Sequence, residues 1–177
     1  MPKEKNVQKT NGKVVLFSLN PKKYREQTIS ITKKIPKSKQ IIYVTLNCGC
    51  VRLSSQFKKA GISTKNILFI GCGEAHDAKE EHPSCVHIPN PHCLTDLSLA
   101  LVKAAVNSNG QKVVVIDSIS TLFSYHDSNK VVVFMNSLIN KMRTMNVTTF
   151  LFVLNSDMEE IFLKRIMSFV DEIKKLP

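Results

Sequence analysis

The sequence predicts an α/β fold with three layers, in which helices cover both faces of a mostly parallel central sheet. Hydrophobic runs of strand length alternate with segments of helical periodicity along the whole chain. Right-handed crossovers between such units make the strands parallel and place the helices on both faces. No internal repeat or linker interrupts this alternation, so we expect a flexible basic tail over residues 1–11 and a single domain over residues 12–177.

The first part of the chain predicts three strands joined by two helices. Asn20 and Pro21 are typical of a helix cap and a first helical turn, so a helix is expected over residues 21–35. A second helix is expected to end at Gly61, after which the chain enters the next strand. The nearly continuous β-branched and aromatic runs, typical of strands buried on both faces, are at residues 13–19, 40–46 and 66–71.

The second part begins with residues 72–92, which have no periodicity and contain three prolines, so we expect a long loop there. The run 112–118 is the most hydrophobic strand of the chain and is expected at the centre of the sheet. Residues 168–176 permit either a helix or a final strand. The remaining predictions are a strand at 147–155 and helices at 94–109, 129–146 and 157–166.

The composition, 43% hydrophobic and 22% charged, is that of a globular protein. No apolar run approaches the roughly 20 residues that span a bilayer, so no membrane span is expected. The N-terminal stretch "MPKEKNVQKTNGK" has no apolar segment of the kind found in secretory signals. Five cysteines without such a signal predict a cytoplasmic protein with free thiols.

The net charge of +11 is unevenly distributed. Residues 1–40 hold eleven of the 25 lysines and arginines, but only Glu4 and Glu26 as acids. Such a segment can attract nucleic acid, an acidic protein face or an anionic membrane surface. It can equally be a lysine-rich helix face in contact with solvent, and the composition does not decide between these interpretations.

The stretch "VVVIDSIST" places Asp117 directly after a buried strand. In parallel α/β sheets, ligands bind beyond the carboxyl ends of the strands. A carboxylate at that edge can hold a Mg²⁺-bound water beside a nucleotide phosphate. It can also simply cap the turn that follows, so the pattern alone leaves both roles open.

The order of the segments resembles the KaiC/RadA-type branch of the RecA-like ATPases over roughly residues 13–176. Within that branch, the chain is most similar to small archaeal relatives that lack the phosphate loop and have no known function. The resemblance implies that Asp117 and Ser118 belong to the second nucleotide motif. It also implies that residues 20–28 correspond to the phosphate loop and residues 47–48 to catalytic glutamates. It rests on "YVTLNCGCVRLSSQFKKAGI", "NILFIGC", "VVVIDSISTLFSY", "FMNSLINKMRTMNVTTFLFVLN" and "FVDEIKKL".

Two of those three places depart from the family pattern. A phosphate loop needs G-x-x-x-x-G-K-[ST], because glycines let backbone N–H groups close around the phosphates. Here the stretch is "NPKKYREQT", with Arg25 at the lysine position and Glu26 at the Mg²⁺-binding hydroxyl position. Asn47 and Cys48 replace the glutamates, and neither is a general base for water. We therefore expect a degenerate ATPase with no cofactor, in which Asp117, Ser118 and Arg25 are residual nucleotide-site positions.

Cysteines and histidines gather around the long loop, and zinc ligands are of these types. Their spacing fits no structural zinc module, and free cysteines are often simply buried. We therefore expect no metal site. The residues that could contribute to one are Cys72, His76, Cys85 and His87.

The function that follows is a non-catalytic regulatory or protein-interaction module that self-associates or pairs with an active relative. Its candidate contact residues are Lys22, Lys23, Arg25, Lys33 and Lys34. One alternative is a nucleic-acid-binding accessory protein that uses this basic region. Aromatic residues are only 7% of the chain, so that binding would be weak and salt-sensitive. Another alternative is residual nucleotide or metal binding. The aromatic residues expected to be exposed are Tyr24, Phe57 and Tyr125.

Overall fold

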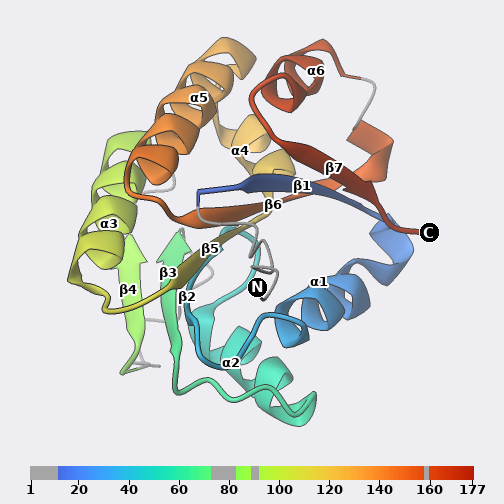
Figure 1. The fold of residues 1–177 in the computed structure, drawn as a ribbon. Coiled ribbons are helices and arrows are strands. Elements are labelled where there is room, and N and C mark those ends of the chain that lie inside the picture. Colours follow the sequence, from blue (N-terminus) through green and yellow to red (C-terminus); the bar gives the residue numbers. More distant parts are fainter. Residues whose placement is uncertain (1–11, 73–82, 89–91, 158–159) are drawn as a thin grey trace, which may run out of the picture.

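A fully parallel seven-stranded sheet forms the centre of the molecule (Figure 1). The structure is a computed structural model that describes residues 12–72, 83–88, 92–157 and 160–177. The strand order is β4-β3-β2-β5-β6-β1-β7, so β5 is central, as its hydrophobic sequence predicts. The strands are β1 (Val14–Leu19), β2 (Gln40–Thr45), β3 (Ile67–Cys72), β4 (Cys85–Ile88), β5 (Lys112–Asp117), β6 (Thr148–Leu154) and β7 (Glu172–Lys175).

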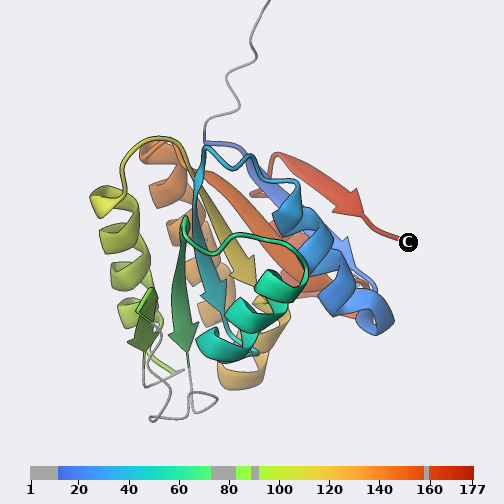
Figure 2. The same ribbon diagram turned by 90° about the horizontal axis from the view of Figure 1, so that it is seen from below.

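Helices cover both faces of the sheet, which confirms the three-layer α/β/α arrangement (Figures 1 and 2). One face carries α1 (Tyr24–Lys33), which follows a turn of 3₁₀-helix, η1 (Pro21–Lys23), and α2 (Cys50–Lys59). The opposite face carries α3 (Leu94–Asn107), α4 (Ile119–Tyr125), α5 (Ser128–Thr144) and α6 (Ile161–Met167). A short 3₁₀ turn, η2 (Asn155–Asp157), follows β6.

Successive side chains of each strand point to opposite faces of the sheet, which divides the core into two parts. In β1, Val14 and Leu16 pack on the side of α3–α6, whereas Val15 and Phe17 pack on the side of α1 and α2. Every residue of β1 is buried, as expected for a strand covered on both faces. None of the helices in the described part of the chain is both long and apolar enough to cross a membrane.

The structure contains two elements that the sequence did not predict, and it decides between the helix and the strand that the sequence left open for a third. The expected loop contains β4, a four-residue strand that pairs with β3 at the edge of the sheet that the structure describes. An additional helix, α4, follows β5 almost directly. The ambiguous C-terminal segment is a strand, β7, which adds to the free edge of β1.

Phe57 was expected to be exposed, and that expectation is wrong. It lies on the inner side of α2 and is fully buried, with its ring 5.3 Å from that of Tyr43 and 6.1 Å from that of Phe69. Tyr125 is exposed, as expected. Tyr24 was also expected to be exposed but is half-buried, because its hydroxyl points inward and donates to the carboxylate of Asp117.

Candidate functional site

The carboxyl end of the central strand carries the one acid predicted for the site. Asp117 is the last residue of β5 and is 1% exposed. Its register partner on the neighbouring strand β2 is Thr45. The backbone N–H of Leu46 donates to the Asp117 carbonyl at 2.8 Å, which continues the ladder to the edge of the sheet.

Three side chains donate hydrogen bonds to the Asp117 carboxylate. The hydroxyl of Tyr24, at the start of α1, donates to Oδ1. The hydroxyl of Tyr43, inside β2, donates to Oδ2 at 2.7 Å, and the Arg25 guanidinium reaches the same oxygen at 3.4 Å. Both carboxylate oxygens are therefore occupied by groups of this chain.

The electrostatics follow from burial. Loss of solvent raises the pKa of the Asp117 carboxyl, against the opposing effects of the Tyr24 hydrogen bond, the Arg25 charge and the Tyr43 hydrogen bond. Burial, followed by the nearby Asp117 charge, raises the pKa of both tyrosine hydroxyls. Both phenols therefore stay protonated and remain hydrogen-bond donors at neutral pH.

The link from β1 to α1 is a tight turn. The Asn20 side chain accepts from the backbone N–H of Lys22 at 3.0 Å, as its predicted capping role requires. The Asn20 N–H itself donates to the Gln27 side chain at 2.8 Å. The amide of Gln27 in turn donates to the carbonyl of Pro177 at 2.8 Å. This turn holds the start of α1 against the end of the sheet, which positions Tyr24 and Arg25.

Ser118, Asn47 and Cys48, which also lie at this edge, bring no carboxylate to it. Ser118 follows Asp117 through a cis peptide bond, is buried and precedes α4. Asn47 accepts a hydrogen bond from the Thr121 hydroxyl, and burial raises the pKa of the Cys48 thiol. The two positions at which the family resemblance places glutamates thus carry an amide and a protonated thiol.

A cavity of about 480 Å³ opens beside this cluster, and we call it the strand-end pocket. Among its lining residues that the structure describes, most of the polar groups are hydroxyls and an amide, and the one acidic residue is Asp157. Asp117 does not line it, whereas Tyr24, which donates to the Asp117 carboxylate, and Ser118 do. The lining includes Pro21, Tyr24, Asn47, Ser118, Thr121 and Asp157.

The five basic residues proposed as a contact surface do not gather in one place. Lys22 and Lys23 are exposed before α1, whereas Lys33 and Lys34 are exposed at its far end. A helix of ten residues is about 15 Å long, so these two pairs are well separated. Arg25 points inward to Asp117 and its side chain is 31% exposed.

The expectation of five free thiols is wrong for two of them. Cys50, which begins α2, and Cys85, which begins β4, form a disulfide with their Cα atoms 6.3 Å apart. Sequence spacing gave no sign of the pair, because β4 itself was not predicted. Cys48, Cys72 and Cys93 are free.

The disulfide also removes Cys85 from the candidate metal ligands. Cys72 is buried, which raises its thiol pKa to about 12, and His87 lies opposite Gly71 on the neighbouring strand. His76 lies outside the described residues. Among the residues that the structure does describe, no three His, Cys, Asp or Glu side chains are grouped as a metal site would require.

Sequence reasoning found Asp117 and Arg25 but missed both tyrosines as their partners. Tyr43 lies in a hydrophobic run, which is typical of a core residue, and it is fully buried. The signal that could have found it is its position two residues before Thr45, the register partner of Asp117, on the same face of the adjacent strand.

The parallel sheet, the helices on both faces and the acid at the end of the central strand define an α/β protein of RecA-like arrangement. A family model described as "ATPase: KaiC" matches residues 28–172. The chain belongs to this family, the KaiC ATPases.

Comparison with solved structures supports the same fold. Among 139 matching chains is a protein of Pyrococcus horikoshii OT3 from a structural study, with a TM-score of 0.62 and 11% sequence identity. The match covers 94% of this chain and 83% of that one. At this identity the likeness concerns the fold alone. No curated protein matches the sequence.

Proposed function

We propose that this chain is a non-catalytic member of the KaiC family, which lacks a working phosphate loop and acts as a regulatory or protein-interaction module. The observation that carries the proposal is that both carboxylate oxygens of Asp117 are already hydrogen-bonded. They accept hydrogen bonds from Tyr24, Tyr43 and Arg25, all from the chain itself.

A strand-end aspartate that serves a nucleotide must present an oxygen to a Mg²⁺-bound water. Here Oδ1 faces the phenol of Tyr24, and Oδ2 faces Tyr43 and a guanidinium. Arg25 supplies the positive charge that a metal ion would otherwise bring. Binding of Mg²⁺ would have to displace Arg25 and break a buried hydrogen bond, which opposes it.

The turn before α1 supports the same conclusion. When residues 20–28 are compared with the phosphate-loop pattern of the family, Arg25 stands at the position of the lysine. Tyr24 then stands immediately before that position. Tyr24 lines the strand-end pocket and donates its hydroxyl to Asp117, so an aromatic side chain stands where a phosphate loop would need glycine. The backbone N–H of Asn20 is already bonded to Gln27 and is not available to a phosphate.

The experiment that tests this proposal measures ATP turnover and Mg²⁺·ATP binding by the purified chain, with Asp117→Ala as the matched control. We expect the turnover of the wild-type protein to equal that of the variant, and calorimetry to detect no tight binding. Robust Mg²⁺-dependent hydrolysis that Asp117→Ala abolishes would overturn the proposal.

The interaction role is tested by sedimentation of the chain alone and mixed with an ATPase-active KaiC-family protein from the same source. We expect self-association or a mixed complex that weakens in Lys22→Glu/Lys23→Glu, because these two side chains are exposed beside the strand-end pocket. Lys58→Glu/Lys59→Glu on α2 makes the same charge change elsewhere and should leave the complex intact. A monomer in both samples would contradict this role.

A second candidate function, nucleic-acid binding, is favoured by the exposed Lys22 and Lys23 pair and by the excess of basic residues in 1–40. The test is retention of single- and double-stranded oligonucleotides at low salt. If this function holds, Lys22→Ala/Lys23→Ala reduces retention and added salt abolishes it. Equal retention by the wild type and the variant would exclude this surface.

A further inference from the structure

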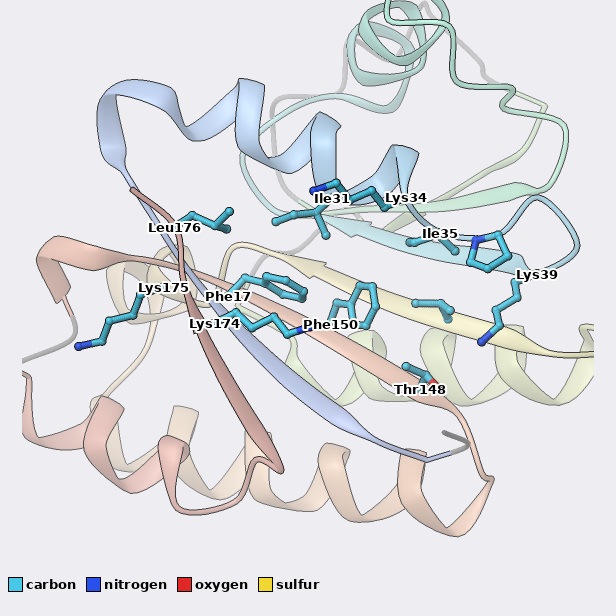
Figure 3. A pocket seen from close by; sticks show the side chains of 12 residues that line it. Phe17, Ile31, Lys34, Ile35, Lys39, Thr148, Phe150, Lys174, Lys175 and Leu176 are labelled. Atoms are coloured by element: carbon cyan, nitrogen blue, oxygen red, sulfur yellow. The ribbon is translucent and has the colours of Figure 1, made fainter. Parts of the chain in front are cut away.

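A second cavity, of about 510 Å³, lies on the face of the sheet that carries α1 (Figure 3). It is formed by the last turn of α1, the starts of β5 and β6, the middle of β1 and the end of β7. It is therefore separate from the strand-end pocket, with which it shares no lining residue. We call it the lysine-rimmed pocket.

The floor of this pocket is apolar. Phe17 and Phe150 meet edge to face, with ring centroids 5.2 Å apart, and form its centre (Figure 3). Ile31 and Ile35 of the α1 side and Leu176 beyond β7 complete the wall. Phe17, Ile31 and Ile35 are almost fully buried, whereas Phe150 and Leu176 are half-buried, so the apolar lining reaches solvent only in part.

The rim carries positive charge. Lys34, Lys39, Lys174 and Lys175 line the pocket, and none of the aspartates and glutamates that the structure describes does. Lys34, Lys39 and Lys175 have no ion-pair partner among the described residues. The Lys174 ammonium lies 5.8 Å from the Phe17 ring centroid, so a charge stands directly over the floor, with one neighbouring carboxylate, Glu172, at 3.4 Å.

Four lysines around an apolar cavity, three of them without an ion-pair partner among the described residues, are complementary to an anion with an apolar body. We propose that the lysine-rimmed pocket binds a small amphipathic carboxylate of the fatty-acid class, its chain on Phe17 and Phe150 and its head group among the lysines. This inference is independent of the proposed loss of ATPase activity. The cavity volume falls within the range of about 300–1,000 Å³ that is usual for small-molecule sites.

The geometry favours a small ligand over nucleic acid. The lysines surround one cavity, whereas a strand of nucleic acid needs a groove that tracks its backbone together with rings that stack on successive bases. Phe17 and Phe150 pack against each other at an interplanar angle of 71°, so they do not form parallel platforms for bases. An acyl chain requires only apolar contact.

The experiment is calorimetric titration of the full chain with dodecanoate, kept below its micelle concentration, at low salt. Dodecanol and dodecyltrimethylammonium serve as neutral and cationic ligands with the same tail. We expect one dodecanoate to bind per chain, dodecanol to bind more weakly and the cation not to bind. A short single-stranded oligonucleotide should not displace dodecanoate.

Two variants separate the contributions of charge and of the apolar floor. Lys34→Gln/Lys39→Gln/Lys174→Gln should weaken dodecanoate binding about tenfold, since each exposed charge contributes only modestly, and should leave dodecanol unaffected. Phe150→Asp should abolish binding of both ligands, with circular dichroism reporting the fold. Lys58→Gln/Lys59→Gln/Lys103→Gln removes the same charge from α2 and α3 and should change nothing.

Three results would overturn the proposal. These are no heat of dodecanoate binding, equal affinity in the two lysine triple variants, or displacement by the oligonucleotide. The last of these would identify the surface as a nucleic-acid site.

Discussion

Tyr43 of β2 donates a 2.7 Å hydrogen bond to the carboxylate of Asp117, the residue that ends the neighbouring strand β5. The tyrosine is fully buried and the aspartate nearly so. The interaction joins the core on the α1 side of the sheet to the site at its edge. It makes Asp117 part of the packed interior, which bears on stability as well as on function.

Removing the Tyr43 hydroxyl should therefore destabilise the protein. Tyr43→Phe leaves one oxygen of a buried carboxylate with a single weak donor, and hydrogen bonds to charged groups contribute about 1.5–3 kcal/mol. We expect a loss of that size in the free energy of unfolding, measured by urea denaturation. Tyr125→Phe, on the surface, is the control and should change it by less than about 0.5 kcal/mol. Equal effects of the two variants would show that the hydrogen bond contributes nothing.

The stability contributed by Asp117 should depend on pH. Burial raises the pKa of its carboxyl above the value of about 3.9 in an unfolded chain, so the folded state binds the proton more tightly. The stability that Asp117 contributes is complete at pH values below its pKa in the unfolded chain. This stability is lost as the pH rises through its pKa in the folded protein. The stability of the wild type relative to Asp117→Asn should thus be greatest under acidic conditions. Urea titrations of both proteins across pH measure this difference, and a difference that grows with pH would contradict it.

The Cys50–Cys85 disulfide should be detectable by counting thiols. In denaturant without reductant, alkylation and intact mass should show three modified cysteines, and after reduction five, as the sequence contains five. Cys85→Ser should lower the free energy of unfolding under oxidising conditions by about 2–4 kcal/mol. Cys93→Ser keeps the bond and should have little effect. Five modified thiols before reduction would show that the pair is not joined.

The three free thiols should react at different rates in the native protein. Cys48 and Cys72 are buried, and burial raises the Cys72 pKa to about 12, so almost no thiolate forms near neutral pH. Cys93 is half-buried and should react first with an aromatic disulfide reagent. Peptide mapping of the singly labelled protein identifies the site, and label on Cys72 before Cys93 would refute the prediction.

Phe57 offers a test of the core beneath α2. It is fully buried against Tyr43 and Phe69, so Phe57→Ala should cost about 3–5 kcal/mol in the free energy of unfolding. Phe57→Leu retains much of the volume and should cost clearly less. A loss below about 1 kcal/mol in the alanine variant would be typical of an exposed position and would contradict this packing.

Much of the fold could be predicted from the sequence, because strands buried on both faces are long hydrophobic runs. β5 was correctly placed at the centre on that ground alone. β4 could not be found, since four residues between prolines at the edge of a sheet have too little pattern to distinguish them from a loop. β7 was ambiguous because its two consecutive exposed lysines break the alternation of apolar and polar residues that is typical of a strand.

The candidate site was predictable in part. Asp117 follows a recognisable strand, but its partners depend on register and side-chain direction. Whether Tyr43 points to the core or to the site is decided by how β2 lies against β5, which one sequence does not contain. The Cys50–Cys85 pair was missed for the same reason, since it depends on β4 pairing with β3.

The position of β1 has a consequence for synthesis of the chain. Val14 pairs with Thr149 on one side and Val15 with Glu172 on the other, so both neighbours of this strand come from distant parts of the sequence. A wholly buried hydrophobic strand thus leaves the ribosome long before either neighbour exists. Nascent chains of this protein should accordingly depend on chaperones that hold β1 until β6 has been translated.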